Sequence, residues 1–168
     1  AMIAAIDVHY KKDGTARVAC ILFDDWTDEE PYKELISTVA EVEEYVSGSF
    51  YLRELPCILH ILEKVQEPLD TIVVDGFVWL AIGRPGLGAH LHKALKGAVP
   101  VIGVAKSHFM EAHSVAKAVT RGKSVNPLYV TAEGIETDKA AKFIENMAGE
   151  YRFPTLLKRL DQLTKEND

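Results

Sequence analysis

The sequence predicts a mixed α/β fold: a sheet that opens with a three-strand antiparallel meander, continues with parallel strands, and carries helices on both faces. Three observations predict it. Short β-branched and apolar runs recur along the chain, an Asp-Gly turn joins the first two of them, and amphipathic helical stretches separate the later ones. Parallel strands need crossover connections, which the helical stretches supply.

The composition is that of one globular domain spanning residues 1–168. Hydrophobic residues make up 48% and charged residues 26% of the chain, which is ordinary usage. The net charge of -6 argues against nucleic-acid binding by bulk charge. A local basic groove stays compatible with that charge.

Cysteine usage and hydropathy indicate a cytoplasmic protein. Cys20 and Cys57 lie in apolar surroundings without CxxC spacing, so we expect reduced, buried thiols. No apolar run approaches the ~18 residues that a membrane span requires. We also expect no signal peptide.

The meander accounts for the first quarter of the chain. Asp13-Gly14, between two apolar runs, is typical of a hairpin turn. Strand periodicity puts Asp7 and His9 on one face of the first strand, and a carboxylate in a buried strand is costly unless it is paired or binds a metal. For His9, a simple hydrogen-bonded role is the competing interpretation. We expect the three strands over residues 2–10, 15–23 and 32–42.

Two acidic residues follow in informative places. Apolar residues at helical spacing predict a helix over 51–65, with Glu54 near its start, where a carboxylate also stabilises a helix through its dipole. A buried strand over 71–74 ends at Asp75-Gly76. The carboxyl end of such a strand is where open α/β sheets bind ligands, although an Asp there can also merely cap the turn.

The second half supplies one more candidate. The run over 100–105 is a buried strand that ends at Lys106, so Lys106 and Asp75 share a sheet edge if their strands are parallel. A solvated lysine is the alternative. The remaining elements are a short helix after Pro85-Gly86, a strand over 122–131, a helix over 138–147 and a last helix from Pro154.

This order of elements is the ribonuclease H-like plan. On that plan Asp7 lies beside the strand that ends in Asp75, and Glu54 faces both. Three carboxylates that converge cannot all stay ionised without a cation. All-oxygen ligands suit Mg²⁺ or Mn²⁺, and such sites hydrolyse phosphodiesters.

The sequence also resembles the endonuclease V family, whose members cut nucleic acid near deaminated purines, especially inosine. The resemblance is carried in order by AAIDVHY, EYVSGSFYLRELP, IVVDG, GLGAHL, PVIGVAKS and YRFPTLLKRLDQL, which together span nearly the whole chain.

The resemblance implies a role for each matching position. The metal ligands would be Asp7, Glu54 and Asp75, and Lys106 would stabilise charge at the scissile phosphate. Tyr45 matches an aromatic wedge that enters the duplex, its alternative being a tyrosine packed on its own loop. Glycines allow close approach to a flipped base; those at matching positions are Gly48, Gly76 and Gly86.

Three departures from the family pattern bear on specificity. Glu44 and Ser47 flank Tyr45 where prolines are usual, and FVWLAIGRP replaces a small-residue His-Pro-Arg run. A late Gly-His-Arg segment, expected to bring a histidine near the metals, aligns with Glu133-Gly134-Ile135. We expect an acidic residue, Glu136 or Glu133, to replace that histidine; the simpler interpretation of Glu136 is a helix-dipole effect.

The predicted function is that of a divalent-metal-dependent endonuclease acting near deaminated purines in DNA or RNA, with activity that is attenuated if the lost histidines matter. The alternative is a catalytically weak relative that binds altered or distorted nucleic acid with a changed specificity. An unrelated nucleotide-binding function ranks last, because the chain has no glycine-rich phosphate loop. Neither a membrane nor a protein partner is implied.

Overall fold

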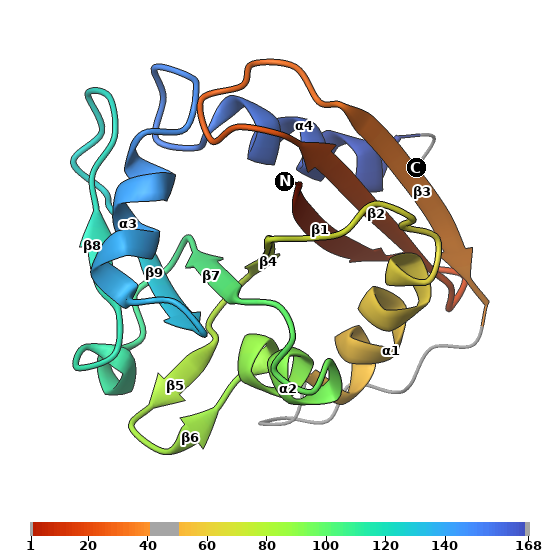
Figure 1. Ribbon diagram of the computed structural model, residues 1–168, viewed down its shortest axis with the longest axis horizontal. Coiled ribbons are helices and arrows are strands. Elements are labelled where there is room, and N and C mark those ends of the chain that lie inside the picture. Colours follow the sequence, from red (N-terminus) through yellow and green to blue (C-terminus); the bar gives the residue numbers. More distant parts are fainter. Residues whose placement is uncertain (1, 41–50, 167–168) are drawn as a thin grey trace.

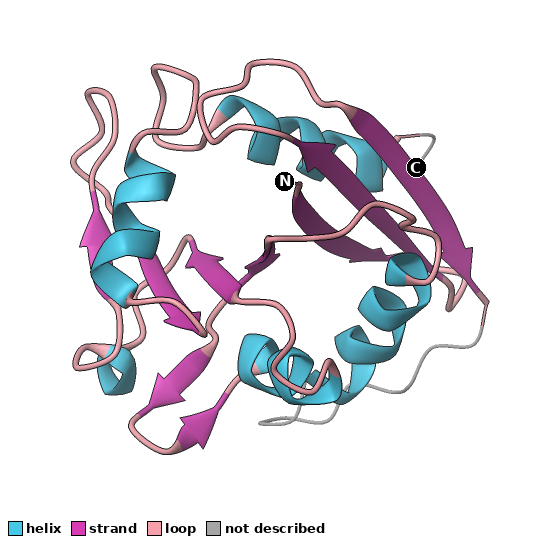
Figure 2. Ribbon diagram, viewed as in Figure 1, coloured by secondary structure: helices cyan, strands magenta, loops and turns pink. Residues whose placement is uncertain are grey.

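The computed structural model describes residues 2–40 and 51–166, which form a seven-stranded sheet, a two-stranded hairpin and flanking helices (Figures 1 and 2). The strands are β1 (Ile3–Tyr10), β2 (Ala16–Phe23), β3 (Lys33–Val39), β4 (Thr71–Asp75), β5 (Trp79–Ala81), β6 (Arg84–Pro85), β7 (Val101–Ala105), β8 (Lys117–Val119) and β9 (Leu128–Glu133). The helices are α1 (Tyr51–Leu62), α2 (Leu87–Ala94), the 3₁₀ turn η1 (Met110–Ala112), α3 (Thr137–Glu145) and α4 (Thr155–Lys165).

The large sheet has the order β3-β2-β1-β4-β7-β9-β8. Strands β1, β2 and β3 form the antiparallel meander, and β4 and β7 continue parallel to β1, which confirms the predicted fold class. Strands β9 and β8 then close the far edge in antiparallel pairings. The carboxyl ends of β1, β4 and β7 therefore meet at one edge of the sheet.

The sheet separates two hydrophobic cores, because successive side chains of a strand point to opposite faces. On β1, Ile3 and Ala5 pack toward α3 and α4, whereas Ala4 and Ile6 pack toward α1 and α2. Figure 1 shows these two helix pairs on opposite sides of the sheet. Asp7 falls in the phase of Ile3 and Ala5, so it points to the α4 side.

Several predicted boundaries differ from the structure. The third strand spans only 33–39, and α1 ends at Leu62. The strand predicted over 122–131 is wrong in position: β9 begins at Leu128, because residues 121–127 turn, with Ser124 and Asn126 bonded to each other. Strands β5, β6 and β8 were not predicted, since two or three residues are too few to show a period.

The described helices can also be compared with the length and hydropathy that a membrane span requires. None of those within residues 2–40 and 51–166 is long and apolar enough to cross a membrane.

Candidate active site

Asp7 and Asp75 lie at the same level on neighbouring parallel strands, Asp7 within β1 and Asp75 as the last residue of β4. Ile6 of β1 pairs with Val74 of β4, so the next residue on each strand is an aspartate. Both carboxylates, with Lys106 from the end of β7, line one recess of about 20 Å³. That volume holds about one water molecule. The structure therefore brings together three of the residues predicted from the sequence.

Glu54 joins this cluster electrostatically from α1. Burial, together with the charges of Asp75 and Asp7, raises the pKa of its carboxyl to about 7. Burial likewise raises the pKa of Asp7 to about 7, with the charge of Asp75 as the next cause, although the Val8 amide donates to Asp7 Oδ1 at 2.9 Å and works in the opposite direction. The three carboxylates resist being ionised together.

Asp75 differs from the other two in its exposure. The pKa of its carboxyl is raised by desolvation and by Asp161, and lowered by Lys106. Asp75 is nevertheless exposed to solvent, whereas Asp7 and Glu54 are half-buried. Solvent therefore screens the charge of Asp75 more than the charges of Asp7 and Glu54.

Asp161 on α4 is a fourth carboxylate that the sequence interpretation missed. Its charge raises the pKa of both Asp7 and Asp75, and its own carboxylate accepts an ion pair from Lys165 at 3.0 Å. A signal for it existed, since Asp161 is the only acidic residue in YRFPTLLKRLDQL. Nothing in the local pattern indicated that α4 would cross beside β1.

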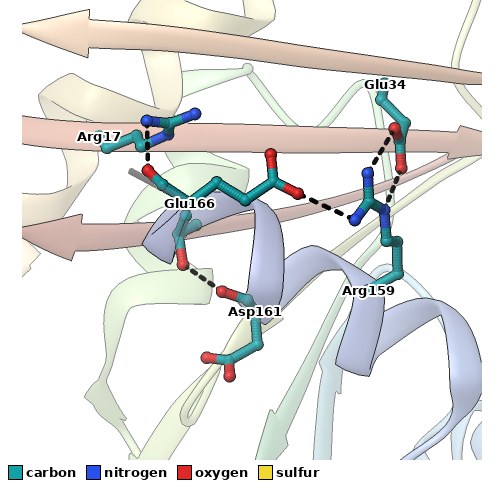
Figure 3. A network of polar contacts seen from close by, with 6 residues as sticks. Arg17, Glu34, Arg159, Asp161 and Glu166 are labelled. Carbon is teal, nitrogen blue, oxygen red and sulfur yellow. Dashed lines mark hydrogen bonds and ion pairs between the residues drawn. The ribbon is translucent and has the colours of Figure 1, made fainter. Parts of the chain in front are cut away.

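Ion pairs and a hydrogen bond join α4 to the meander (Figure 3). Arg159 contacts Glu34 with two hydrogen bonds of 2.8 and 3.2 Å and also contacts Glu166 at 3.1 Å. Arg17 of β2 donates to the carbonyl of Glu166 at 2.8 Å. In Figure 3 the carboxylate of Asp161 points away from these contacts, and its own ion pair is with Lys165.

The turn after Asp75 folds back across the sheet. Gly76 has a φ of +90°, which favours glycine, and the Val78 amide donates to the buried Thr131 hydroxyl at 2.7 Å. Gly103 makes room for this turn: a Cβ there would lie 2.5 Å from the carbonyl oxygen of Gly76. The backbone beside Asp75 is therefore held rigidly.

The three glycines predicted to contact substrate have different outcomes. Gly76 is half-buried with open space around it, so its contact stays a prediction. Gly86 is buried, and a Cβ there would lie 2.4 Å from the carbonyl oxygen of Phe77, so packing also requires a glycine; its contact with substrate stays a prediction. Gly48 and Tyr45 lie outside the described residues.

The replacement of the late histidine by Glu136 or Glu133 is a wrong prediction. Glu133 pairs with Val101 at the start of β7, whereas Asp75 pairs with Val104 near its end, so β9 delivers Glu133 and then Glu136 to the opposite end of the sheet. The acidic residue that joins the site is Asp161 instead. Gly134 has a φ of +85°, so a histidine at that position would be strained.

The donor set suits a hard divalent cation. Carboxylate oxygens are the ligands that Mg²⁺ and Mn²⁺ prefer, and raised carboxyl pKa values mark a cluster that a cation would relieve. In their present conformations, no three His, Cys, Asp or Glu side chains within the described part of the chain are arranged to hold a metal. The fit therefore rests on the chemistry of the cluster.

A mixed sheet that gathers acidic side chains at the carboxyl ends of its central parallel strands defines a ribonuclease H-like protein. A sequence profile described as Endonuclease V matches residues 1–162. The chain belongs to the endonuclease V family.

Known proteins show the extent of this similarity. The endonuclease V of Trichormus variabilis is 27% identical over 180 residues, covering 96% of this chain and 80% of the relative. The Rhodospirillum centenum enzyme is 29% identical, with 94% and 74% covered. The Streptomyces avermitilis structure superposes with a TM-score of 0.78 at 25% identity, over 98% of this chain and 80% of that one.

A further solved structure is similar in fold. Ciona intestinalis endonuclease V, in complex with a 23mer DNA containing an inosine followed by a ribo-adenosine, has a TM-score of 0.83 at 19% identity. It covers 98% of this chain and 84% of its own.

Proposed function

We propose that this chain is a divalent-metal-dependent endonuclease that hydrolyses phosphodiester bonds near deaminated purines, inosine above all, in DNA or RNA. The observation that carries the proposal is the recess at one sheet edge where Asp7, Asp75 and Lys106 meet. Membership of the endonuclease V family and the DNA complex of the Ciona protein support it.

The acidic residues would hold the cation. Asp7, Glu54 and Asp75 are the ligands in this proposal, with Asp161 as a fourth carboxylate. Mg²⁺ or Mn²⁺ bound there would polarise the scissile phosphate and neutralise its charge. Lys106 would place a positive charge beside the same phosphate and stabilise the charge that develops as the bond breaks.

The base-recognition residues complete the proposal. Gly76 would let the backbone approach a base taken out of the stack, as would Gly48, and Tyr45 would fill the gap in the duplex. Action in the cytoplasm accords with the free, buried thiols of Cys20 and Cys57.

The second candidate is a weakly catalytic relative that binds altered nucleic acid. The turn after Asp75 favours it, because Phe77 packs near Phe109 with ring centroids 5.9 Å apart. Of this pair, Phe77 stands in the stretch where the family pattern has a small-residue His-Pro-Arg run. A less polar base pocket would change specificity or reduce the rate.

One cleavage assay separates the candidates. Labelled DNA and RNA strands that carry one inosine are incubated with Mn²⁺ or Mg²⁺, beside matched strands that carry adenine. We expect cleavage near inosine, abolished by Asp75→Asn, with Lys142→Ala on the exposed surface of α3 as a matched control. Binding without cleavage would support the second candidate, and neither binding nor cleavage would contradict both.

A further inference from the structure

Lys106 is held at both ends by two consecutive residues. Its side chain is exposed, yet its Nζ lies 4.4 Å from the centroid of the Phe153 ring. Its backbone carbonyl accepts a hydrogen bond from Nη2 of Arg152. The Arg152-Phe153 dipeptide therefore contacts both the main chain and the ammonium of the lysine that lines the recess.

Arg152 is itself fixed by carbonyl oxygens. Its Nε donates to Asn126 at 2.9 Å and its Nη2 to Pro127 at 2.9 Å, besides the bond to Lys106. The guanidinium thus connects the turn before β9 to the end of β7. A planar group with several fixed donors suits this role better than a lysine would.

Arg121 holds the segment that carries the dipeptide. It is only 5% exposed, and its guanidinium donates to backbone carbonyls between the end of α3 and the start of α4. The five acceptors are Glu145, Met147, Gly149, Tyr151 and Arg152. Burying a charge is costly unless it is hydrogen-bonded, so these acceptors fix the course of the segment.

The choice of an aromatic ring has a chemical consequence. A carboxylate partner would hold the ammonium but would also compete with a phosphate for it. The face of Phe153 attracts the cation without supplying an anionic oxygen. Phe153 and Lys106 line the same recess as the aspartates, so the ring steers the ammonium while leaving its charge to a substrate.

We propose that Arg152 and Phe153 are positioning residues for Lys106, and that Arg121 keeps them in place. The proposal rests on the proposed function of Lys106 as the charge stabiliser at the phosphate. It also makes a structural claim about the lysine that can be measured without activity.

The placement is tested by NMR of protein labelled with ¹³C at lysine Cε, with the Lys106 signal assigned by Lys106→Arg. We expect a ring-current shift that Phe153→Tyr keeps and Phe153→Leu abolishes. Arg152→Ala should reduce it, because the lysine backbone is then released. An unchanged Lys106 signal in Phe153→Leu and Arg152→Ala would overturn the proposal.

The mechanistic consequence is tested by single-turnover kinetics on an inosine-containing strand. Phe153→Leu should lower the rate constant about two- to fivefold, the loss expected for an exposed cation–π contact, with little change in KM. In a Lys106→Ala background the same change should have no further effect. An equal loss in both backgrounds would mean that Phe153 acts independently of Lys106, which overturns positioning.

The two proposals fail in different ways. If Lys106→Ala cleaves at the wild-type rate, the proposed role of Lys106 is wrong, whatever its NMR signal shows. If Lys106→Ala cleaves slowly but the Lys106 NMR signal is unchanged in Phe153→Leu and Arg152→Ala, only the positioning proposal is wrong.

Discussion

Trp79 donates a hydrogen bond of 2.9 Å from its indole nitrogen to Oε2 of Glu133. The bond ties the β5–β6 hairpin to the end of β9, far along the sheet from the aspartates. Glu133 therefore has a structural partner, and its carboxylate serves the hairpin that follows the Asp75 turn.

This contact predicts that Glu133 stabilises the fold without affecting metal dependence. Trp79→Phe and Glu133→Ala should each lower the free energy of unfolding by about 1 kcal/mol, and the double variant by little more. Thermal unfolding of the three variants measures this. A changed Mg²⁺ requirement in Glu133→Ala would contradict the assigned position.

The buried carboxylates predict that stability falls as pH rises in the absence of a divalent cation. The pKa of Asp7 rises from 3.8 to about 7 on folding, so the folded protein binds this proton more tightly than the unfolded chain does. The stability gained from the protonated Asp7 is therefore complete below about pH 4 and is lost as pH rises through 7. Asp7→Asn should therefore stabilise the protein by about 1–2 kcal/mol at pH 8 and change little at pH 4. Melting temperatures of the wild type and Asp7→Asn at both pH values test this. An equal effect of the substitution at pH 8 and pH 4 would contradict the raised pKa of Asp7.

A divalent cation should reverse this loss. Protons compete with a metal for Asp7 and Glu54, so Mg²⁺ should raise the melting temperature more at pH 8 than at pH 5. At about ten times its Kd the cation adds about 1.4 kcal/mol to the free energy of unfolding. Calorimetry with Mg²⁺ measures the gain, which Asp75→Asn should remove and Asp161→Asn should reduce. A gain that is the same in all variants would place the cation elsewhere.

Arg121 should be among the most sensitive positions for stability. Arg121→Ala leaves backbone carbonyls of the 145–152 segment without their donor, at a cost of about 3 kcal/mol. Arg159→Ala provides the contrast: its ion pairs with Glu34 and Glu166 are partly exposed, so about 1 kcal/mol is expected. Urea unfolding of both variants compares them, and similar losses would contradict the assigned role of Arg121.

Much of the fold could be predicted because its signals are local. Asp13-Gly14 marks the hairpin, and the apolar runs that end at Asp75 and Lys106 mark buried parallel strands. Strand order then placed Asp7 beside Asp75, as the register of Ile6 with Val74 confirms. The sequence by itself determined the meander, the parallel strands β4 and β7, and the edge at which the aspartates meet.

Only the tertiary structure decided what reaches that edge from elsewhere. The sequence gives no direction to β9, and its antiparallel pairing takes Glu133 and Glu136 to the far end of the sheet. The buried leucines of α4 pack on β1 and β2, far away in the chain, and this packing brings Asp161 to the aspartates. Contacts between residues distant in sequence leave no period or motif in the chain, so folding alone assembles the cluster.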